Sequence, residues 1–286
     1  MPKVSALSMV SYDSQFLLRS IPYYLPFVDE LILGVDADGL SWSGEPVEIS
    51  EEFFTALSQI DQYDKIKIVK ERFHIPGKSA LELDTRERNI LSSHASHDGW
   101  LVSIDADELM INAKEFFDFL RAWKGAASCM VGNWIVVYKL LGDKVLLVSA
   151  QHGGGLEQFP LATLTREAFV TCRWTNEPRV VSPALALHYS WGRSPEELAF
   201  KLRNWSHKVD FDVDSYLRLW NALDDKNYKY VRDLHPFQSA VWPSLICVPN
   251  ANLMNISIDE LLPLPEDLPL REILQTLGRK FKKRLS

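Results

Sequence analysis

The sequence predicts an α/β protein built on a mostly parallel, mixed sheet with helices on both faces. Three observations support this fold class. Short apolar runs alternate with segments of helical apolar spacing as far as Trp123. Two of these runs, ending at Asp36 and Asp105, lead into acidic residues rather than into hairpin turns. With 286 residues, the chain is also long enough to bury a large core. Alternation at this spacing is typical of parallel βαβ units.

The elements of this first half follow from their apolar spacing. Buried or alternating runs predict strands at residues 4–12, 29–39, 65–73 and 99–105. Apolar residues three to four apart predict helices at residues 14–28, 50–61, 80–96 and 112–123. Ser14 and Ser50 stand where N-cap residues are expected, because a serine hydroxyl accepts a hydrogen bond from the first turn. In sheets of this kind, ligands bind beyond the carboxyl ends of the strands.

The second half begins near residue 126 and predicts a more mixed arrangement. The apolar runs on either side of "LGDK" (141–144) predict paired strands, and a glycine-rich loop follows at residues 151–160. Residues 194–209 predict a helix, with Ser194 as N-cap and Glu197 completing a capping box. We expect a main domain over residues 1–209 and a helical C-terminal extension over residues 210–286.

Charge and composition narrow the classes of function. The formal net charge of -7 argues against a nucleic-acid partner, because a general nucleic-acid binder needs a basic face. Cys129, Cys172 and Cys247 lie far apart without metal-ligand spacing, which predicts buried thiols in a reducing compartment. No run reaches the roughly 18 apolar residues that a membrane span needs. The composition therefore predicts a cytoplasmic protein.

The C-terminal residues combine helical apolar spacing with a basic end. Leu270, Leu274, Leu277 and Phe281 share one helical face, and residues 279–284 contain five basic side chains. One interpretation is a helix docked on the core with a solvated basic end. The alternative is weak peripheral contact with the inner face of an anionic membrane.

Three carboxylates follow the strand predicted at residues 99–105. Asp105, Asp107 and Glu108 stand within four residues in the stretch "IDADE". Carboxylates this close repel one another, so they either lie in solvent or hold a cation. Oxygen ligands of this kind suit Mg²⁺ or Mn²⁺, which proteins often hold through one or two carboxylates together with substrate phosphates. The sequence leaves both a metal site and a solvated strand end open.

Three stretches together resemble the glycosyltransferase family 2-like enzymes with a GT-A fold. They are "QFLLRSIPYYLPFVDELILGVD" (15–36), "TRERNILSSHASHDGWLVSIDADE" (85–108) and "LHYSWGRSPEELAFKLRNWSH" (187–207). The resemblance implies a hexosyltransferase-like enzyme that uses a nucleotide-diphosphate sugar, a divalent cation (Mn²⁺ or Mg²⁺), and a saccharide or lipid-linked acceptor. A role in building cell-surface polysaccharide fits this class.

The resemblance also assigns roles to residues of the first half. Asp107 would bind the cation, Asp105 would hold the ribose or share the cation, and Glu108 would orient the loop. Asp36 and Arg88 match family residues near the nucleotide or its diphosphate. The sequence departs from the family after the first strand, where Asp13 stands in place of an Asn-Glu pair. Asp13 is therefore the expected contact to the base.

Further candidates lie in the second half. His188 ends an apolar run, where its imidazole is either a further metal ligand, as the resemblance implies, or part of the core. Arg193 and Lys201 would neutralise the departing diphosphate, although a helical lysine is most often solvated. Trp191 stands between His188 and Arg193 and is the tryptophan expected to contact a ligand.

An inverting transferase also needs a carboxylate base near the acceptor hydroxyl. Glu157, in the glycine-rich loop, is the expected base, with His152 as a competing candidate and a plain surface loop as the alternative. Two other functions remain open. A sugar-phosphate nucleotidyltransferase usually carries a glycine-rich loop after the first strand, and "SMVSYDSQFLLRS" has none. A non-catalytic carbohydrate or partner-binding module would have lost the metal ligands, yet Asp105, Asp107 and His188 are present.

Overall fold

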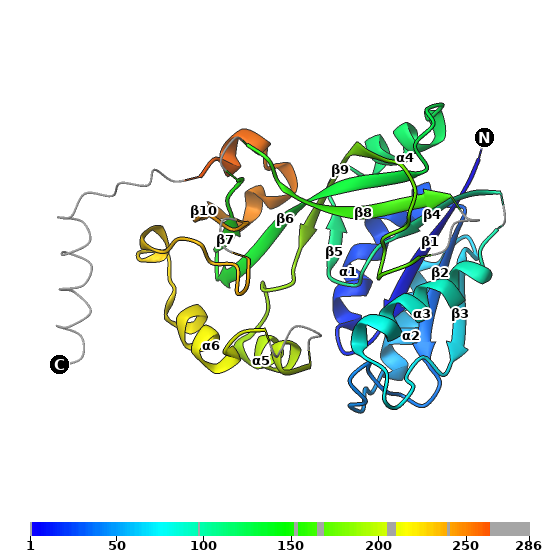
Figure 1. Cartoon of the computed structure of the whole chain (residues 1–286), viewed down its shortest axis with the longest axis horizontal. Helices are drawn as coiled ribbons and strands as arrows, with labels where there is room; N and C mark the ends of the chain where they lie inside the picture. The colour runs from blue at the N-terminus through cyan, green and yellow to red at the C-terminus, as the bar shows by residue number, and fades with distance from the viewer. Residues whose placement is uncertain are drawn as a thin grey trace. The chain divides into compact units, whose positions relative to one another are not determined.

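The computed structural model describes residues 2–96, 98–151, 154–164, 169–204, 210–238 and 241–263 (Figure 1). The chain divides into two units. The first comprises Met1–Trp134, Gln158–His188 and Asn204–Ser206. The second comprises Ile135–Glu157, Tyr189–Arg203 and His207–Ser286. The extension predicted from residue 210 stays a prediction, and its basic end lies outside the described residues.

The first unit contains a parallel core of four strands. They are β1 (Lys3–Val10), β2 (Glu30–Asp36), β3 (Ile66–Glu71) and β4 (Gly99–Ser103). Their order in the sheet is β3-β2-β1-β4, and every neighbouring pair is parallel. The chain therefore moves outward from β1 to β3 and then returns to the other side of β1. The α/β fold class predicted from the sequence is confirmed.

Helices cover both faces of this core, as predicted. They are α1 (Ser14–Tyr24), α2 (Glu51–Ile60), α3 (Ala80–Ser93) and α4 (Ala113–Ala122). In β2, Leu31 and Leu33 point to the face that packs against α1, α2 and α4. Ile32 points to the opposite face, where it packs with Leu91 of α3. This alternation follows from the two-residue period of a strand.

The helix ends agree with the sequence to within one residue in α2 and α4, whereas α3 ends at Ser93 rather than at residue 96 and α1 differs at both ends. Ser50 caps α2 by accepting a hydrogen bond from the backbone N–H of Phe53 at 3.3 Å. The N-cap of α1 is Asp13, so the prediction of Ser14 as N-cap was wrong by one residue. The α1 helix also ends earlier than predicted and continues as the 3₁₀ helix η1 (Leu25–Phe27), where Pro26 has no N–H for a further α-helical bond.

Antiparallel strands extend the sheet of the first unit beyond β4. They are β5 (Glu108–Met110), β6 (Cys129–Leu141), β8 (Glu157–Leu164) and β9 (Arg179–His188). Strand β8 pairs with β4, and β6 lies next to β8. The short strand β5 pairs with the end of β9. The sheet is therefore mixed, with a parallel core and an antiparallel margin.

The second unit is built around the remainder of β6. Its other elements are β7 (Lys144–Val148), α5 (Pro195–Asn204), α6 (Val213–Ala222), η2 (Tyr228–Tyr230), β10 (Leu245–Pro249), η3 (Asn250–Asn255) and η4 (Ile258–Leu261). The β6–β7 pair confirms the hairpin predicted around "LGDK". Ser194 and Glu197 form the predicted capping box of α5 through bonds of 3.2 and 2.9 Å. The helix was predicted to reach residue 209, but residues 205–209 lie outside the described residues.

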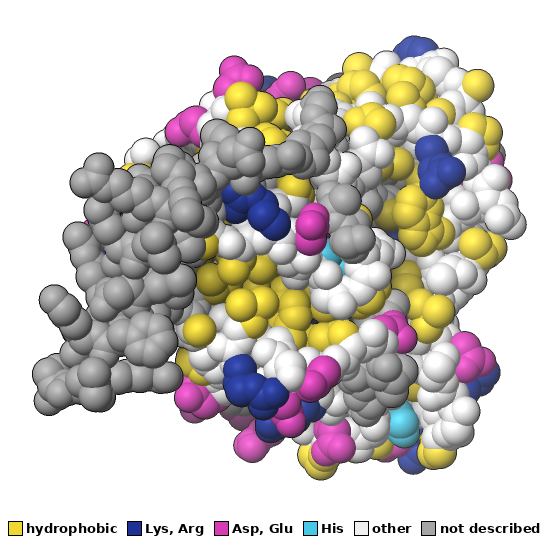
Figure 2. Space-filling model, turned by 60° about the vertical axis from the view of Figure 1, so that its left-hand side comes forward, with side chains coloured by type: hydrophobic (Ala, Val, Ile, Leu, Met, Phe, Trp, Pro, Cys, Tyr) yellow, Lys and Arg dark blue, Asp and Glu magenta, His cyan; other side chains and the backbone are white. Residues whose placement is uncertain are grey.

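Two properties of the described residues concern the predicted partners: the hydropathy of the helices and the distribution of surface charge. Among the described residues, no helix is both long enough and apolar enough to cross a bilayer. On the face drawn in Figure 2, acidic and basic side chains are scattered among apolar and uncharged ones, without a continuous basic area among the described residues.

Candidate functional site

The acidic turn between β4 and β5 lies at the point where the strand order reverses. The chain passes from β1 outward to β3 and returns to β4, which is the other neighbour of β1. Open α/β sheets bind ligands at this switch point, outside the carboxyl ends of the strands. Strand β4 ends at Ser103, so Asp105, Asp107 and Glu108 stand directly beyond that edge.

Glu108 closes this turn on itself. Its backbone N–H donates to the carbonyl of Asp105 at 3.0 Å, and its side-chain Oε2 accepts from the backbone N–H of Asp105 at 3.0 Å. The Glu108 side chain is 1% exposed. Burial raises its pKa to about 7, although the neighbouring Arg173 opposes the shift. The predicted role of Glu108 in orienting the loop agrees with these contacts.

Asp107 and His188 come together because β5 pairs with β9. Glu108 stands opposite His188 in this antiparallel ladder, and Asp107 immediately precedes the strand. Asp107 Oδ1 lies 3.7 Å from His188 Nε2, and both side chains are largely buried. The ring of Trp134, from β6, stacks on the His188 imidazole with centroids 4.2 Å apart. The Trp134 indole N–H also donates to Glu108 Oε1 at 2.9 Å, so one residue contacts both sides of the ladder.

Asp105 is held by two buried guanidinium groups. Arg88 Nη2 donates to Asp105 Oδ1 at 2.9 Å, and Arg173 Nη2 forms an ion pair with Asp105 Oδ2. Burial alone would raise the pKa of Asp105, but Arg173 and Arg88 outweigh burial and hold it at about 2. Asp105 is therefore ionised at neutral pH, and about a third of its side chain remains exposed (32%).

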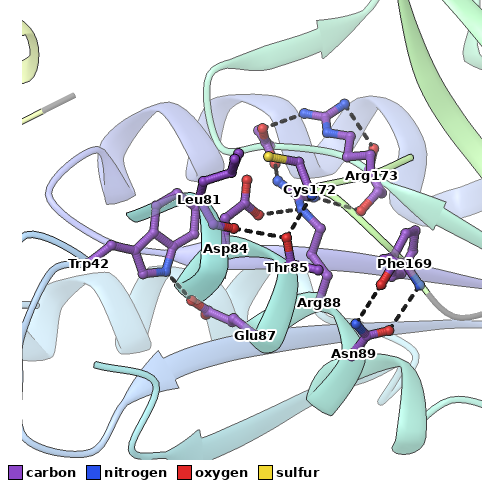
Figure 3. A network of polar contacts seen from close by, with 12 residues as sticks. Trp42, Leu81, Asp84, Thr85, Glu87, Arg88, Asn89, Phe169, Cys172 and Arg173 are labelled. Carbon is purple, nitrogen blue, oxygen red and sulfur yellow. Dashed lines mark hydrogen bonds and ion pairs between the residues drawn. The ribbon is translucent and has the colours of Figure 1, made fainter. Parts of the chain in front are cut away.

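Helix α3 supplies Arg88 and anchors the segment that carries Arg173 (Figure 3). Besides Asp105, Arg88 donates from Nε to Asp84 at 2.5 Å and from Nη1 to the hydroxyl of Ser103 at 2.7 Å. Asp84 and Arg88 are four residues apart, so they lie on the same face of the helix. All three nitrogens of Arg88 thus donate to protein groups, and the residue is 2% exposed. Arg88 therefore contacts the end of β4 and the first acid of the acidic turn.

The second acidic strand end, at Asp36, has different partners. Its Oδ1 accepts from the backbone N–H groups of Asp38 and Leu40 at 2.9 and 3.1 Å. Its Oδ2 accepts from those of Phe73 and His74 at 2.8 and 3.0 Å. These four bonds lower the pKa of Asp36 although burial opposes them. Asp36 therefore joins the loop after β2 to the segment after β3.

A buried glutamate anchors the loop that follows Asp36. Glu87, on α3, is 5% exposed and accepts a hydrogen bond from the indole N–H of Trp42 at 2.7 Å (Figure 3). Burial raises the pKa of Glu87 to about 8, against the smaller opposing effects of the Trp42 bond and Arg88. At neutral pH this side chain is mostly a neutral acid. The remaining candidate of the first unit, Asp13, is half-buried and is the N-cap residue of α1.

Four predicted site residues belong to the second unit. Arg193 Nε donates to the backbone carbonyl of Ser190 at 3.3 Å, and Lys201 Nζ donates to the Ser190 hydroxyl at 2.9 Å. Trp191 is 2% exposed and packs against Tyr138, Tyr216 and Trp242. This burial places Trp191 within an aromatic cluster of the unit.

Glu157, the predicted base, is half-buried in the same unit. It accepts a hydrogen bond from the Trp242 indole N–H at 2.8 Å. Burial raises its pKa, with the Trp242 bond opposing. The competing candidate, His152, lies outside the described residues. The roles predicted for these second-unit residues stay predictions.

Two residues of the acidic turn's surroundings were not predicted from the sequence. Arg173 comes from "CRWTN", and Trp134 from the middle of a long apolar strand. Neither stretch carries a motif of fixed spacing. Their connection to the turn depends on pairing between segments more than 25 residues apart, which a single sequence does not display.

The metal prediction can be compared with the donor atoms present. Among the described residues, no group of three or more His, Cys, Asp and Glu side chains is arranged to hold a metal ion. Asp107 and His188 nevertheless bring a carboxylate oxygen and an imidazole nitrogen together at the strand ends. Two protein ligands fit an ion that takes its other ligands from substrate phosphates and water. Asp105 fits less well, because both of its oxygens already contact guanidinium groups.

Comparison with known proteins gives distant structural likeness only. No family model matches the sequence, and no curated protein matches it. TarS from S. aureus (residues 1–349) aligns with 70% of this chain at 12% identity and a TM-score of 0.34. GalNAc-T7, solved with UDP, GalNAc and Mn²⁺, aligns with 78% at 12% identity and a TM-score of 0.38. A 4-diphosphocytidyl-2C-methyl-D-erythritol synthase aligns with 58% at 11% identity and a TM-score of 0.31.

These alignments are partial on both sides. The chain spans 63% of the TarS structure, 52% of GalNAc-T7 and 75% of the synthase. The likeness thus extends to glycosyltransferases and to a nucleotidyltransferase at similar TM-scores. At TM-scores below 0.5 it assigns no function, and the residues of the acidic turn must support any proposal.

Proposed function

We propose that this protein is a metal-dependent glycosyltransferase with a GT-A-like fold, which moves a sugar from a nucleotide-diphosphate donor to a hydroxyl acceptor. The observation that carries the proposal is the Asp107–His188 pair, 3.7 Å apart beyond the end of β4. A carboxylate and an imidazole at the switch point of a parallel sheet can hold a divalent cation where a nucleotide would bind.

The roles of the three acids differ in this proposal. Asp107 and His188 hold the cation, and the mixed oxygen and nitrogen donors suit Mn²⁺ better than Mg²⁺. Asp105, ionised and partly exposed, accepts a hydrogen bond from a ribose hydroxyl of the donor. Glu108 keeps the turn closed. The bound cation supplies positive charge next to the phosphate oxygens, which become more negative as the nucleoside diphosphate leaves.

The resemblance places Arg88 and Asp36 at the nucleotide, but in this proposal they hold other parts of the protein. The donors of Arg88 and the carboxylate of Asp36 are engaged by protein partners. We therefore assign Arg88 to holding Asp105, and Asp36 to joining the loop after β2 to the segment after β3. Asp13 stays the proposed contact to the base.

The remaining predicted site residues, Trp191 excepted, keep their roles as proposals. Glu157 is the proposed base, and its raised pKa would favour accepting a proton from the acceptor hydroxyl. Arg193 and Lys201 are the proposed cations for the departing diphosphate. Trp191 is 2% exposed inside its aromatic cluster, so it is not proposed as a ligand contact. A saccharide or lipid-linked acceptor and peripheral membrane contact belong to the same proposal.

Nucleotide binding tests the proposal directly. The melting temperature of the full chain is measured with UDP or GDP, each with Mn²⁺ and with EDTA, for wild type and Asp107→Asn. A ligand at 100 times its Kd adds about 2.7 kcal/mol of stability, which corresponds to a rise of about 5 °C or more. We expect one nucleotide to give such a rise, only with Mn²⁺, and only in the wild type.

Asp38→Asn is the matched control, because Asp38 occupies the same place in "VDAD" as Asp107 in "IDAD". It should keep the full nucleotide-dependent rise. Stabilisation by nucleoside triphosphates with Mg²⁺, and not by diphosphates, would replace the proposal with a sugar-phosphate nucleotidyltransferase. No rise with any nucleotide would reject it and favour a non-catalytic binding module.

A further inference from the structure

We infer that Arg173 is a positioning residue that fixes the Asp107–His188 pair for cation binding. This inference rests on the proposed function and names a residue that the sequence did not single out. The described contacts of Arg173 are with Asp105 and Glu108, on either side of Asp107 in the chain, and with the aromatic rings that pack next to His188.

The first step is the contact of Arg173 with both ends of the acidic turn. Its Nη2 forms ion pairs with Asp105 Oδ2 and, at 2.7 Å, with Glu108 Oε1. Asp107 stands between these two residues in the chain. A single nitrogen that bridges the two carboxylates therefore fixes the spacing of the backbone that presents Asp107.

The second step is packing against the neighbours of His188. The guanidinium carbon of Arg173 lies 5.3 Å from the ring centre of Phe159 and 5.9 Å from that of Trp134. Phe159 and Trp134 are stacked with their centroids 4.5 Å apart, and Trp134 stacks in turn on His188. Arg173 thus contacts the stack that orients the imidazole as well as the turn that carries the carboxylate.

The third step is the anchoring of Arg173 itself. Asn89 of α3 makes two hydrogen bonds with the backbone of Phe169, donating at 2.9 Å and accepting at 3.0 Å (Figure 3). Thr85 Oγ1 accepts from the backbone N–H of Cys172 at 2.8 Å. Cys172 has a φ of +48°, an uncommon conformation for a residue other than glycine. These contacts tie the segment to α3 and direct Arg173 at the turn.

Replacing Arg173 changes both the charge and the geometry of the acidic turn. These two changes have opposite expected effects on cation binding. Removing a cation makes the turn more negative, which by itself would strengthen cation binding. Releasing the turn would weaken binding, because partners behind metal ligands typically account for 10–100-fold in affinity. Glu108 closes the turn itself, so Glu108→Gln is the reference for the side chain at position 108. Going from Glu108→Gln to the double variant Arg173→Met/Glu108→Gln removes only the cation, so weaker Mn²⁺ binding in the double variant reports the loss of positioning rather than of charge.

The experiment measures Mn²⁺ affinity of the full chain without nucleotide and with UDP or GDP, from the electron paramagnetic resonance signal of free Mn²⁺, with nucleotide alone as the reference. We expect the double variant to bind Mn²⁺ about 10–100-fold more weakly than Glu108→Gln. Arg173→Lys, which keeps one cation between the carboxylates, should lose less affinity than the double variant. This partial rescue would not arise from a general loss of stability.

Lys139→Met is the matched control for stability. Lys139 is a buried cation of the second unit that donates to the carbonyls of Trp220, Asn221 and Leu223. Its loss should lower the melting temperature but leave Mn²⁺ affinity within about twofold of wild type. Should the double variant not fold, Arg173→Lys decides alone, with a loss of threefold or more supporting the inference.

The experiment distinguishes failure of the positioning role of Arg173 from failure of the proposed function. Wild-type affinity for Mn²⁺ in the folded Arg173 variants would overturn the positioning role while leaving the proposed function intact. Absence of Mn²⁺ binding by the wild type, both without nucleotide and with UDP or GDP, would overturn the metal-dependent function and, with it, the role of Arg173.

Discussion

The chain contains two strand ends with the same three residues, Asp-Ala-Asp, and they have different structures. After β2, Asp36 accepts four backbone N–H groups, and Asp38 is an exposed residue paired with Arg72 at 3.0 Å. After β4, Asp105 is held by two buried guanidinium groups, and Asp107 is buried beside His188. Both ends lie at the carboxyl edge of the same parallel core.

The difference shows what turns a short acidic pattern into a candidate metal site. At the β2 end, the first acid accepts hydrogen bonds from backbone N–H groups and so shapes two loops. The second acid stays at the surface. At the β4 end, side chains from α3 and from residue 173 neutralise the first acid. The second acid can then be buried beside an imidazole. Spacing alone does not distinguish the two cases.

The largest expected effect is a difference in reaction rate between variants of Asp107 and Asp38, the second acids of the two strand ends. Asp107→Asn should lower the rate of nucleoside diphosphate release from a donor sugar by at least about 100-fold, because the proposed cation loses a ligand. Asp38→Asn should change the rate by less than about twofold. The measurement is initial rate with saturating Mn²⁺ and the donor found by thermal shift. Equal losses in the two variants would remove the functional contrast between the strand ends.

A smaller effect is expected from the first acid of the β2 end. Asp36→Asn places an amide among four N–H donors and should lower the free energy of unfolding by about 1–3 kcal/mol at pH 7. The folded pKa of Asp36 is lowered, so its contribution is present above its unfolded pKa and is lost as pH falls through the folded value.

Urea unfolding of both proteins between pH 7 and pH 3 measures this difference, which should shrink as the solution becomes acidic. Mn²⁺ affinity should stay unchanged in Asp36→Asn. A difference that is constant with pH would mean that the charge of Asp36 is not what stabilises the loops.

A pH-dependent effect is expected from Glu87, which anchors the loop after the β2 end through Trp42. Its folded pKa, about 8, lies above the ordinary glutamate value of 4.5, so the folded state binds more protons between these values. Stability should therefore fall as pH rises through this window, by at most about 1.4 kcal/mol per pH unit. Glu87→Gln keeps an acceptor for Trp42 without a charge.

The wild-type stability measured relative to Glu87→Gln should thus decline from pH 5 to pH 8. Denaturant unfolding at several pH values in this range gives the slope. A flat difference between the two proteins would show that Glu87 titrates near its ordinary value.

Much of the fold could be predicted from the sequence because it depends on local periodicity. The alternating Leu31, Ile32 and Leu33 serve the two faces of the sheet, and Ser50, Ser194 and Glu197 cap helices as expected. The end of α1 was predicted too late, since the proline at position 26 was not weighed against the apolar spacing. Strands β8, β9 and β10 were not predicted, because short apolar runs in the second half have no distinct period.

The candidate site could be predicted only where its residues follow strand ends. Asp105, Asp107 and Glu108 were found from one stretch, and His188 from the end of another apolar run. The environment that separates Asp107 from Asp38 could not be found in this way. It depends on Arg173 and Trp134, whose contacts with the turn arise from long-range pairing of segments.

The alternating charges around Asp105 also have an evolutionary consequence. Asp84, Arg88, Asp105, Arg173 and Glu108 form one chain of buried ion pairs in which each guanidinium group contacts two acids. Losing one member leaves a buried partner without its counter-charge, which is more costly than exchanging both. Among homologous sequences these five positions should change together or not at all. Changes at Asp36 should not be coupled to changes at any other position, since its partners are backbone groups that every sequence supplies.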